Sequence, residues 1–98
     1  MNIEQIEHEL TNRKGALVTV VRPGYGTQSD SWDGRLMLSG NEFPIIFQVV
    51  SQESATIFGS DDIADVELRP AVGMIRQEEQ IIIRLKGPYD YKEHFVKA

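Results

Sequence analysis

The chain contains no cysteine among its 98 residues. Without thiols it can form no disulfide framework, no thiolate metal site and no cysteine nucleophile. Its apolar runs are only a few residues long, whereas a membrane-spanning helix needs about 20 apolar residues. The N-terminus also lacks the basic-then-apolar pattern of a signal peptide. We therefore expect a soluble, cytoplasmic protein with no membrane partner.

Basic residues are also scarce. Ten Lys and Arg stand against fifteen Asp and Glu, which gives a formal net charge of −5. Nucleic-acid binding takes most of its non-specific affinity from Lys and Arg on phosphates, and no basic run of that kind is present. The acidity has one local maximum, made of Glu53, Asp61, Asp62, Asp65 and Glu67. This cluster is either a solvated edge or a docking surface for a basic partner, and nucleic acid is not expected.

The apolar content is high enough for a folded core. Leu, Ile, Val and Phe supply 28 of the 98 residues, well above the share found in disordered chains. The length suits one core, because two cores would each be too small to fold easily alone. No internal repeat or linker interrupts the sequence. We therefore expect a single domain over residues 1–98.

Residues 2–12 have the pattern of one amphipathic helix. Three apolar residues recur at helical spacing on one face: Ile3, Ile6 and Leu10. Asn2 is a suitable N-cap, and Gln5 three positions later approximates a capping box. Gly15 is a natural stop. A helix this short is marginal alone, so its apolar stripe must pack on the rest of the chain.

Residues 16–86 have the texture of strands and turns. Strand-like segments occur at residues 16–22, 34–39, 43–50, 54–58, 65–69 and 80–86, and residues 61–65 resemble a single helical turn. Several short strands separated by turn signals are typical of a small barrel or sandwich. Closing the sheet would remove its open edges. We predict a mainly β fold with one N-terminal helix, a small antiparallel barrel of five or six strands, and a tail over residues 87–98.

The order of these elements resembles that of the Sm-like and SH3-like small barrels. The similarity covers roughly residues 2 to 69: a helix, then ALVTVV, GRLML and PIIFQVV, then SATIFGSDDIADVEL. The resemblance implies the fold, and members of the Sm-like family bind RNA and assemble into rings. The basic and polar residues with which that family contacts RNA have no clear counterparts here. Since fold does not imply function, only the fold is transferred, and an RNA-binding ring is kept as a third hypothesis.

The segment 23–33, PGYGTQSDSWD, is the first candidate site. It joins two predicted strands but is longer than the roughly two to five residues of a usual hairpin loop, and long loops often carry function. It contains Tyr25, Asp30, Trp32 and Asp33, and aromatic rings beside polar groups suit recognition of a peptide or a small ligand. The alternative is that Trp32 packs onto the rim of the barrel and Tyr25 covers an apolar edge.

The same segment suggests a second class of function. A small-ligand-binding or hydrolytic domain would use Asp30 and Asp33 as paired carboxylates near the barrel mouth. No nucleophile elbow or catalytic triad accompanies them. The two histidines, His8 and His94, are too few for a zinc site without cysteine, and the carboxylates lack the spacing of a calcium loop. We therefore expect no metal, no cofactor and no catalytic residue.

The tail over residues 87–98 alternates aromatic and charged residues. Its rings, Tyr89, Tyr91 and Phe95, either pack on the chain's own sheet or contact a second copy, since oligomerisation is a natural source of stability for a small domain. The leading hypothesis is a non-enzymatic interaction module, self-associating, that recognises a protein or peptide partner through residues 23–33. It predicts that Trp32→Ala weakens binding with little change in melting temperature.

Overall fold

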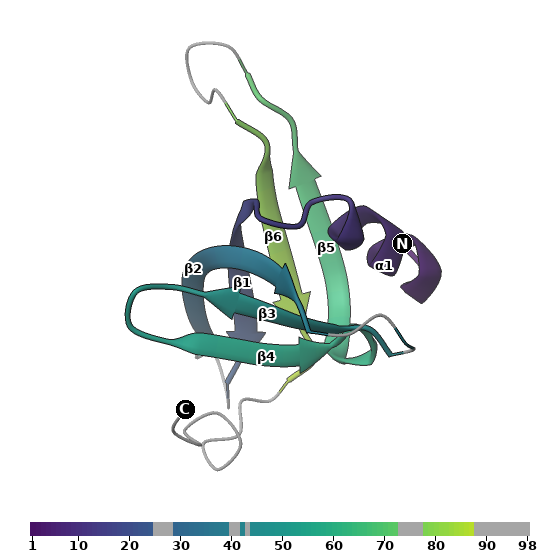
Figure 1. Cartoon of the computed structure of the whole chain (residues 1–98), viewed down its shortest axis with the longest axis horizontal. Coiled ribbons are helices and arrows are strands. Elements are labelled where there is room, and N and C mark those ends of the chain that lie inside the picture. Colours follow the sequence, from purple (N-terminus) through teal and green to yellow (C-terminus); the bar gives the residue numbers. More distant parts are fainter. Residues whose placement is uncertain (25–28, 40–41, 43, 73–77, 88–98) are drawn as a thin grey trace.

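The computed structural model describes residues 1–24, 29–39, 42, 44–72 and 78–87. Its elements in chain order (Figure 1) are α1 (Ile3–Thr11), β1 (Leu17–Pro23), β2 (Ser29–Leu38), β3 (Ile46–Val50), β4 (Ala55–Gly59), the 3-10 turn η1 (Ser60–Asp62), β5 (Ile63–Arg69) and β6 (Gln80–Leu85). The expected mainly β fold with one N-terminal helix is confirmed. No helical segment in the described ranges has the length and apolar character needed to cross a membrane.

The helix α1 begins as its sequence predicts. The Asn2 side chain accepts a hydrogen bond from the Gln5 backbone N–H at 2.8 Å, and the Gln5 side chain accepts one from the Asn2 N–H at 3.0 Å. This reciprocal capping box satisfies two donors at the helix start. Ile6 and Leu10 are buried, and Gly15 turns the chain toward β1 with a φ of 88°, a conformation that glycine adopts without strain.

The six strands form one sheet in the order β4-β3-β2-β1-β6-β5. Neighbouring strands are antiparallel, except that β1 and β6 are parallel. The sheet is therefore mixed, and because β4 and β5 are not paired it is not closed. Six strands were within the predicted number, but the predicted antiparallel barrel is not confirmed, because the sheet is open and β6 pairs in parallel with β1. The run Ile81–Ile83, buried on both faces of the sheet, is the sequence signal of such an interior strand.

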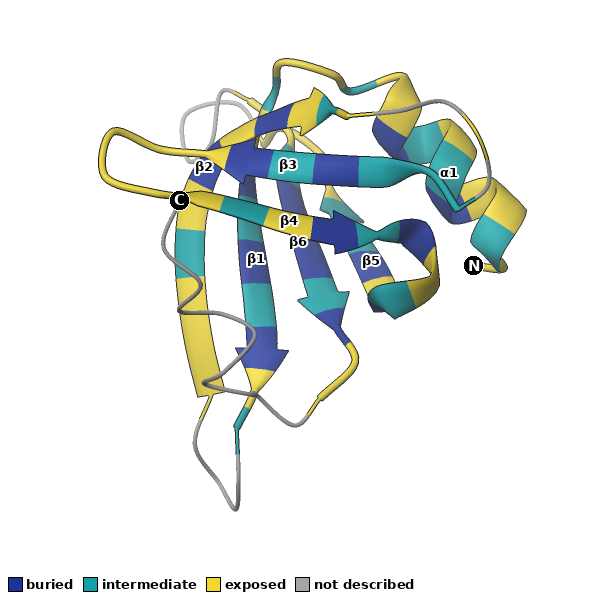
Figure 2. Cartoon of the chain, turned by 60° about the horizontal axis from the view of Figure 1, so that its bottom comes forward, coloured by how far each residue is buried: buried dark blue, intermediate teal, exposed yellow. Residues whose placement is uncertain are grey.

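The strand β2 joins the two parts of the sheet. Its first part pairs with β1 as far as Arg35, and its last part pairs with β3 from Arg35 onward. Gly34 lies at this change of partner, where a Cβ atom would be 2.7 Å from the Val50 carbonyl oxygen and 2.7 Å from Val49 Cγ1. Glycine therefore permits the close approach that bends β2. As a result, β3 and β4 run across β1 and β6 (Figures 1 and 2).

The hydrophobic core lies inside this bend. Buried residues alternate with less buried ones along β1 and β3 (Figure 2), so each strand presents one face inward. The inward apolar residues are Ile6, Leu10, Val18, Val20, Leu36, Phe47, Val49, Phe58, Ile63, Val66, Ile81, Ile83 and Leu85. Leu36 represents β2 in this set, and Ile81, Ile83 and Leu85 represent β6.

The turn η1 is bonded to the helix on one side. The Ser60 hydroxyl donates to the Glu7 carboxylate of α1 at 2.6 Å, and the Ser60 N–H donates to the Ile45 carbonyl at 2.8 Å. Glu7 also accepts the Ile45 N–H at 3.2 Å. Ser60 is 1% exposed, so these bonds satisfy polar groups that water cannot reach. The helix is thereby fixed to the start of β3 and the end of β4.

On its other side η1 is bonded to β1 and to the end of β6. Arg22, 6% exposed, forms an ion pair with Asp62 and donates to the Lys86 carbonyl at 2.8 Å. The Lys86 N–H donates to the Asp62 carbonyl at 2.8 Å. The turn expected at residues 61–65 is formed by Ser60–Asp62, its N-cap residue is Gly59, and no side chain caps it. The Asp62 carboxylate binds the buried cation instead.

Gly34→Ala tests the bend. The added methyl group would collide with the backbone of Val50, so we expect a loss of about 1–3 kcal/mol in the free energy of unfolding, measured by urea denaturation. The matched control is Gly15→Asn, because Gly15 has open space around it and asparagine tolerates positive φ. Equal stability of the two variants would contradict the role assigned to Gly34.

Candidate functional site

The segment 23–33 is mostly strand in the structure. The strand β1 continues to Pro23, and β2 begins at Ser29, directly opposite Pro23 in the register. Residues 29–33, which the sequence analysis predicted to be part of a loop, belong to β2 and lie at an exposed end of its pairing with β1. Tyr25, one of its two aromatic residues, lies outside the described residues. The described part of this segment is therefore mainly strand and not the long recognition loop that the sequence predicted.

Trp32 points toward the core side of β2. It lies opposite Val20, is half-buried, and packs against the core cluster. Its indole N–H is buried without a hydrogen-bond partner. Of the two interpretations of this residue, packing on the sheet is thus the one that the structure supports. Its place in the fold gives it a structural role, and the binding role remains only a prediction.

Asp30 and Asp33 lie on opposite faces of β2. Asp30 is opposite Arg22 on the inner side, whereas Asp33 accepts a hydrogen bond from the Thr19 hydroxyl at 2.6 Å on the outer side. Side chains alternate between the two faces of a strand, so residues three positions apart lie on opposite faces. The two carboxylates therefore do not converge on one substrate. Within the described residues no group of three or more His, Cys, Asp and Glu could hold a metal ion.

The other predicted contact residues belong to the C-terminal tail. Tyr89, Tyr91 and Phe95 lie outside the described residues, as does His94, and self-association through them stays a prediction. His8 is on the exposed side of α1, with its Nε2 atom 3.1 Å from the side-chain nitrogen of Asn12. That contact is local to the helix.

The acidic residues between 53 and 67 are spread over several elements. Asp62 is used in the buried ion pair of η1. On β5, Glu67 bonds both Arg69 and Arg84, and Asp65 lies 3.5 Å from Arg84. Hydrogen bonds from Arg69 and, to a smaller extent, from Arg84 lower the pKa of Glu67 to about 2. Three of the five acidic residues of the cluster, Asp62, Asp65 and Glu67, thus have cationic partners within the chain, and a docking surface for a basic partner stays a prediction.

Sequence reasoning missed the face of the sheet that points away from the core. Four large apolar side chains are well exposed there: Leu17 (51%), Met37 (38%), Val50 (37%) and Ile57 (60%). The signal was present, since strand alternation assigns these residues to the outside, where polar residues are expected. Such exposed apolar patches commonly mark interaction sites.

Strand register brings these side chains together. Met37 is opposite Gln48, which is opposite Ile57, so one row crosses β2, β3 and β4. A second row crosses β1, β2 and β3, with Leu17 opposite Arg35 and Arg35 opposite Val50. We call these residues together the outer face: Leu17, Arg35, Met37, Gln48, Val50 and Ile57.

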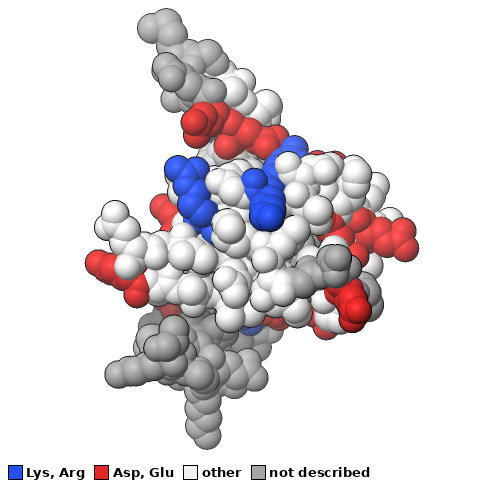
Figure 3. Space-filling model, in the orientation of Figure 1, with Lys and Arg blue, Asp and Glu red and all other residues white. Residues whose placement is uncertain are grey.

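The outer face is poor in charge. The space-filling view in the orientation of Figure 1 shows a broad uncharged area over β3 and β4 (Figure 3). Lys and Arg side chains border this area above, and Asp and Glu side chains lie toward its sides (Figure 3). In a chain with 25 charged residues, an uncharged area of this extent is a distinct region of the surface.

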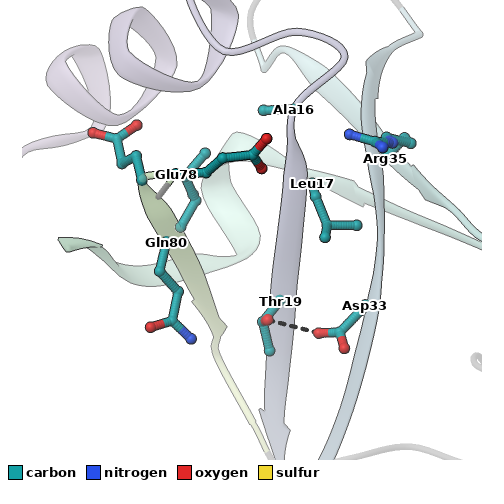
Figure 4. A pocket seen from close by; sticks show the side chains of 9 residues that line it. Ala16, Leu17, Thr19, Asp33, Arg35, Glu78 and Gln80 are labelled. Carbon is teal, nitrogen blue, oxygen red and sulfur yellow. Dashed lines mark hydrogen bonds between the residues drawn. The ribbon is translucent and has the colours of Figure 1, made fainter. Parts of the chain in front are cut away.

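An open groove continues the outer face toward β6. Its volume is about 610 Å³, and it is lined by Ala16, Leu17, Thr19, Asp33, Arg35, Glu78, Glu79, Gln80 and Ile81 (Figure 4). Leu17 and Arg35 belong both to the groove and to the outer face. Glu79 is neutralised by Arg13, to which it is bonded at 2.6 Å and 3.0 Å, and these bonds lower its pKa.

Arg35 differs from the other arginines of the described structure. The other four, which are Arg13, Arg22, Arg69 and Arg84, each form an ion pair with a carboxylate of the chain. Arg35 has a single hydrogen bond, a long one of 3.5 Å to the Gly15 carbonyl. That distance lies beyond the usual range, so its guanidinium remains available to a ligand.

No family model, curated protein or solved structure matches this chain. Its functional surface therefore has to be identified from its own geometry.

Substitutions at Trp32 test the placement of this residue. Trp32→Ala removes packing against the core. In place of the small change in melting temperature expected from the sequence, we now expect a loss of about 2–3 kcal/mol in the free energy of unfolding, less than for a fully buried tryptophan. Trp32→Phe keeps an aromatic ring and removes the unpaired N–H, so its change should stay within about 1 kcal/mol. Thermal and urea denaturation measure both. A Trp32→Ala variant as stable as the wild type would place the side chain outside the core.

Proposed function

We propose that this chain is a non-catalytic interaction module that binds an extended polypeptide segment on its outer face. The observation that supports this is a set of exposed apolar side chains in two neighbouring rows on one face of the sheet, at Leu17, Met37, Val50 and Ile57. Covering apolar surface is worth roughly 25 cal/mol per Å², so a partner gains affinity by shielding these side chains from water. The expected interaction module is thus retained, and its recognition surface is transferred from residues 23–33 to the sheet.

The shape of the surface favours a polypeptide over a compact ligand. The side chains stand in rows across neighbouring strands, about 4.8 Å apart. An extended segment, whose own side chains alternate, can place one residue between two rows and the next in solvent. Gln48 lies between Met37 and Ile57 and offers one amide for hydrogen bonding within an otherwise apolar row.

The charge of the surface disfavours nucleic acid. Binding to phosphates requires several Lys and Arg on one face, and the outer face has one, Arg35. The chain as a whole has a net charge of −5 and repels a polyanion. The RNA-binding hypothesis that follows from the Sm-like resemblance is therefore not adopted. Self-association through Tyr89, Tyr91 and Phe95 remains a separate hypothesis, which light scattering of the full chain would test.

Selection of peptides from a random displayed library tests the proposal. We expect the wild-type protein to enrich peptides whose affinity falls at least tenfold in Ile57→Asp, which places a charge in the apolar row. Ile57 is 60% exposed, so the melting temperature of this variant should be unchanged.

Val72→Asp is the matched control, because Val72 is 48% exposed and lies outside the outer face. It should bind the selected peptides as the wild type does. Selected peptides that bind Ile57→Asp as tightly as the wild type, or that lose equal affinity to Val72→Asp, would contradict the proposal.

A further inference from the structure

We propose that the outer face selects segments that present a carboxylate to Arg35, so that its partner is an acidic side chain flanked by apolar residues. This inference rests on the proposed function and names the chemistry of the partner. It follows from the contrast between Arg35 and the other described arginines, all of which have a carboxylate within the chain.

The neighbours of Arg35 explain why the missing carboxylate matters. Its cross-strand neighbours on the two sides are Leu17 and Val50, both exposed and apolar. A segment that covers these two side chains also removes water from the guanidinium between them. Covering a cation without supplying an anion is unfavourable, whereas a carboxylate forms charge-assisted hydrogen bonds with the planar guanidinium. The same apolar contact therefore becomes selective for acidic segments.

The groove beside β1 limits where the acidic residue can lie. Asp33 and Glu78 line the groove, and Glu78 and Arg35 lie on opposite sides of Leu17 (Figure 4). The Asp33 carboxylate is already bonded to the Thr19 hydroxyl at 2.6 Å. Glu78 repels an acidic group from the β6 side of Leu17, and Asp33, which lies two positions before Arg35 on the same face of β2, repels one from that end of the groove. The acidic residue of the segment is thus directed to the side of Arg35 that faces β3, which fixes the position of the segment on the sheet.

Charge also distinguishes this partner from a second copy of the chain. The outer face contains one guanidinium and no carboxylate. A symmetric pair of outer faces would bring two Arg35 side chains toward one interface without an anion between them. A foreign segment with an acidic residue satisfies the cation that a second copy would leave unpaired.

The test uses random seven-residue peptides with Glu, Gln or Lys fixed at the central position, selected in parallel on the full chain. We expect the Glu library to yield the tightest binders, and those binders to lose about tenfold or more in affinity for Arg35→Gln. On Arg35→Glu the preference should reverse in favour of the Lys library. Arg35 is exposed and has a single weak bond, so both variants should keep the wild-type melting temperature.

The matched control is Arg69→Gln, which removes an exposed outward arginine that is already bonded to Glu67. It should leave the preference for Glu unchanged. Equal enrichment of the Glu and Gln libraries, with binding still lost in Ile57→Asp, would overturn this inference while leaving the proposed function in place. A wild-type dimer in light scattering that Ile57→Asp dissociates would also overturn it, because a second copy would then occupy the face.

Discussion

The guanidinium of Arg22 is buried at the end of β1, where it pairs with Asp62 and donates to the carbonyl of Lys86. A buried cation that loses its partner costs several kcal/mol, so η1 must stay against the ends of β1 and β6. The same turn is bonded to Glu7 of the helix through Ser60. Since β4 and β5 are not paired and the sheet is open, these polar contacts hold its two parts together. They connect the β4 end of the sheet to the β1 and β6 strands in its other part.

This constraint leaves the two faces of the sheet with different roles. The bend at Gly34 and the contacts of η1 enclose the apolar side chains of the inner face, which supply the core. No element in the described ranges packs over the outer face across β3 and β4 (Figures 1 and 3). The apolar side chains there contribute little to folding, because they remain exposed. In the proposed binding mode, the apolar side chains and the guanidinium of Arg35 are held in place by the folded sheet, and such preorganisation lowers the entropy cost of association.

Local patterns in the sequence predicted the local parts of this structure. The capping box at Asn2 and Gln5, the packing of Ile6 and Leu10 on the rest of the chain, and most of the strand segments depend on spacing within a few residues, and they are confirmed. Sheet order depends on which distant segments pair, and alternation carries no information on this, so the parallel pairing of β1 with β6 was missed. The same limit applies to the site. The contact between Arg22 and Asp62 spans 40 positions, and Arg35 is distinctive only because every other described arginine found a partner.

We infer from these contacts that η1 holds the two parts of the sheet together as one cooperative unit. Native-state hydrogen exchange tests it most directly, at the Ser60 amide bonded to Ile45 and the Lys86 amide bonded to Asp62. Both amides are expected to exchange with the same free energy of opening as the core amides of Val20 and Ile83, that is, only through global unfolding. Exchange of Ser60 and Lys86 at a much lower opening free energy, while the sheet stays protected, would show that η1 opens independently and would contradict the claim.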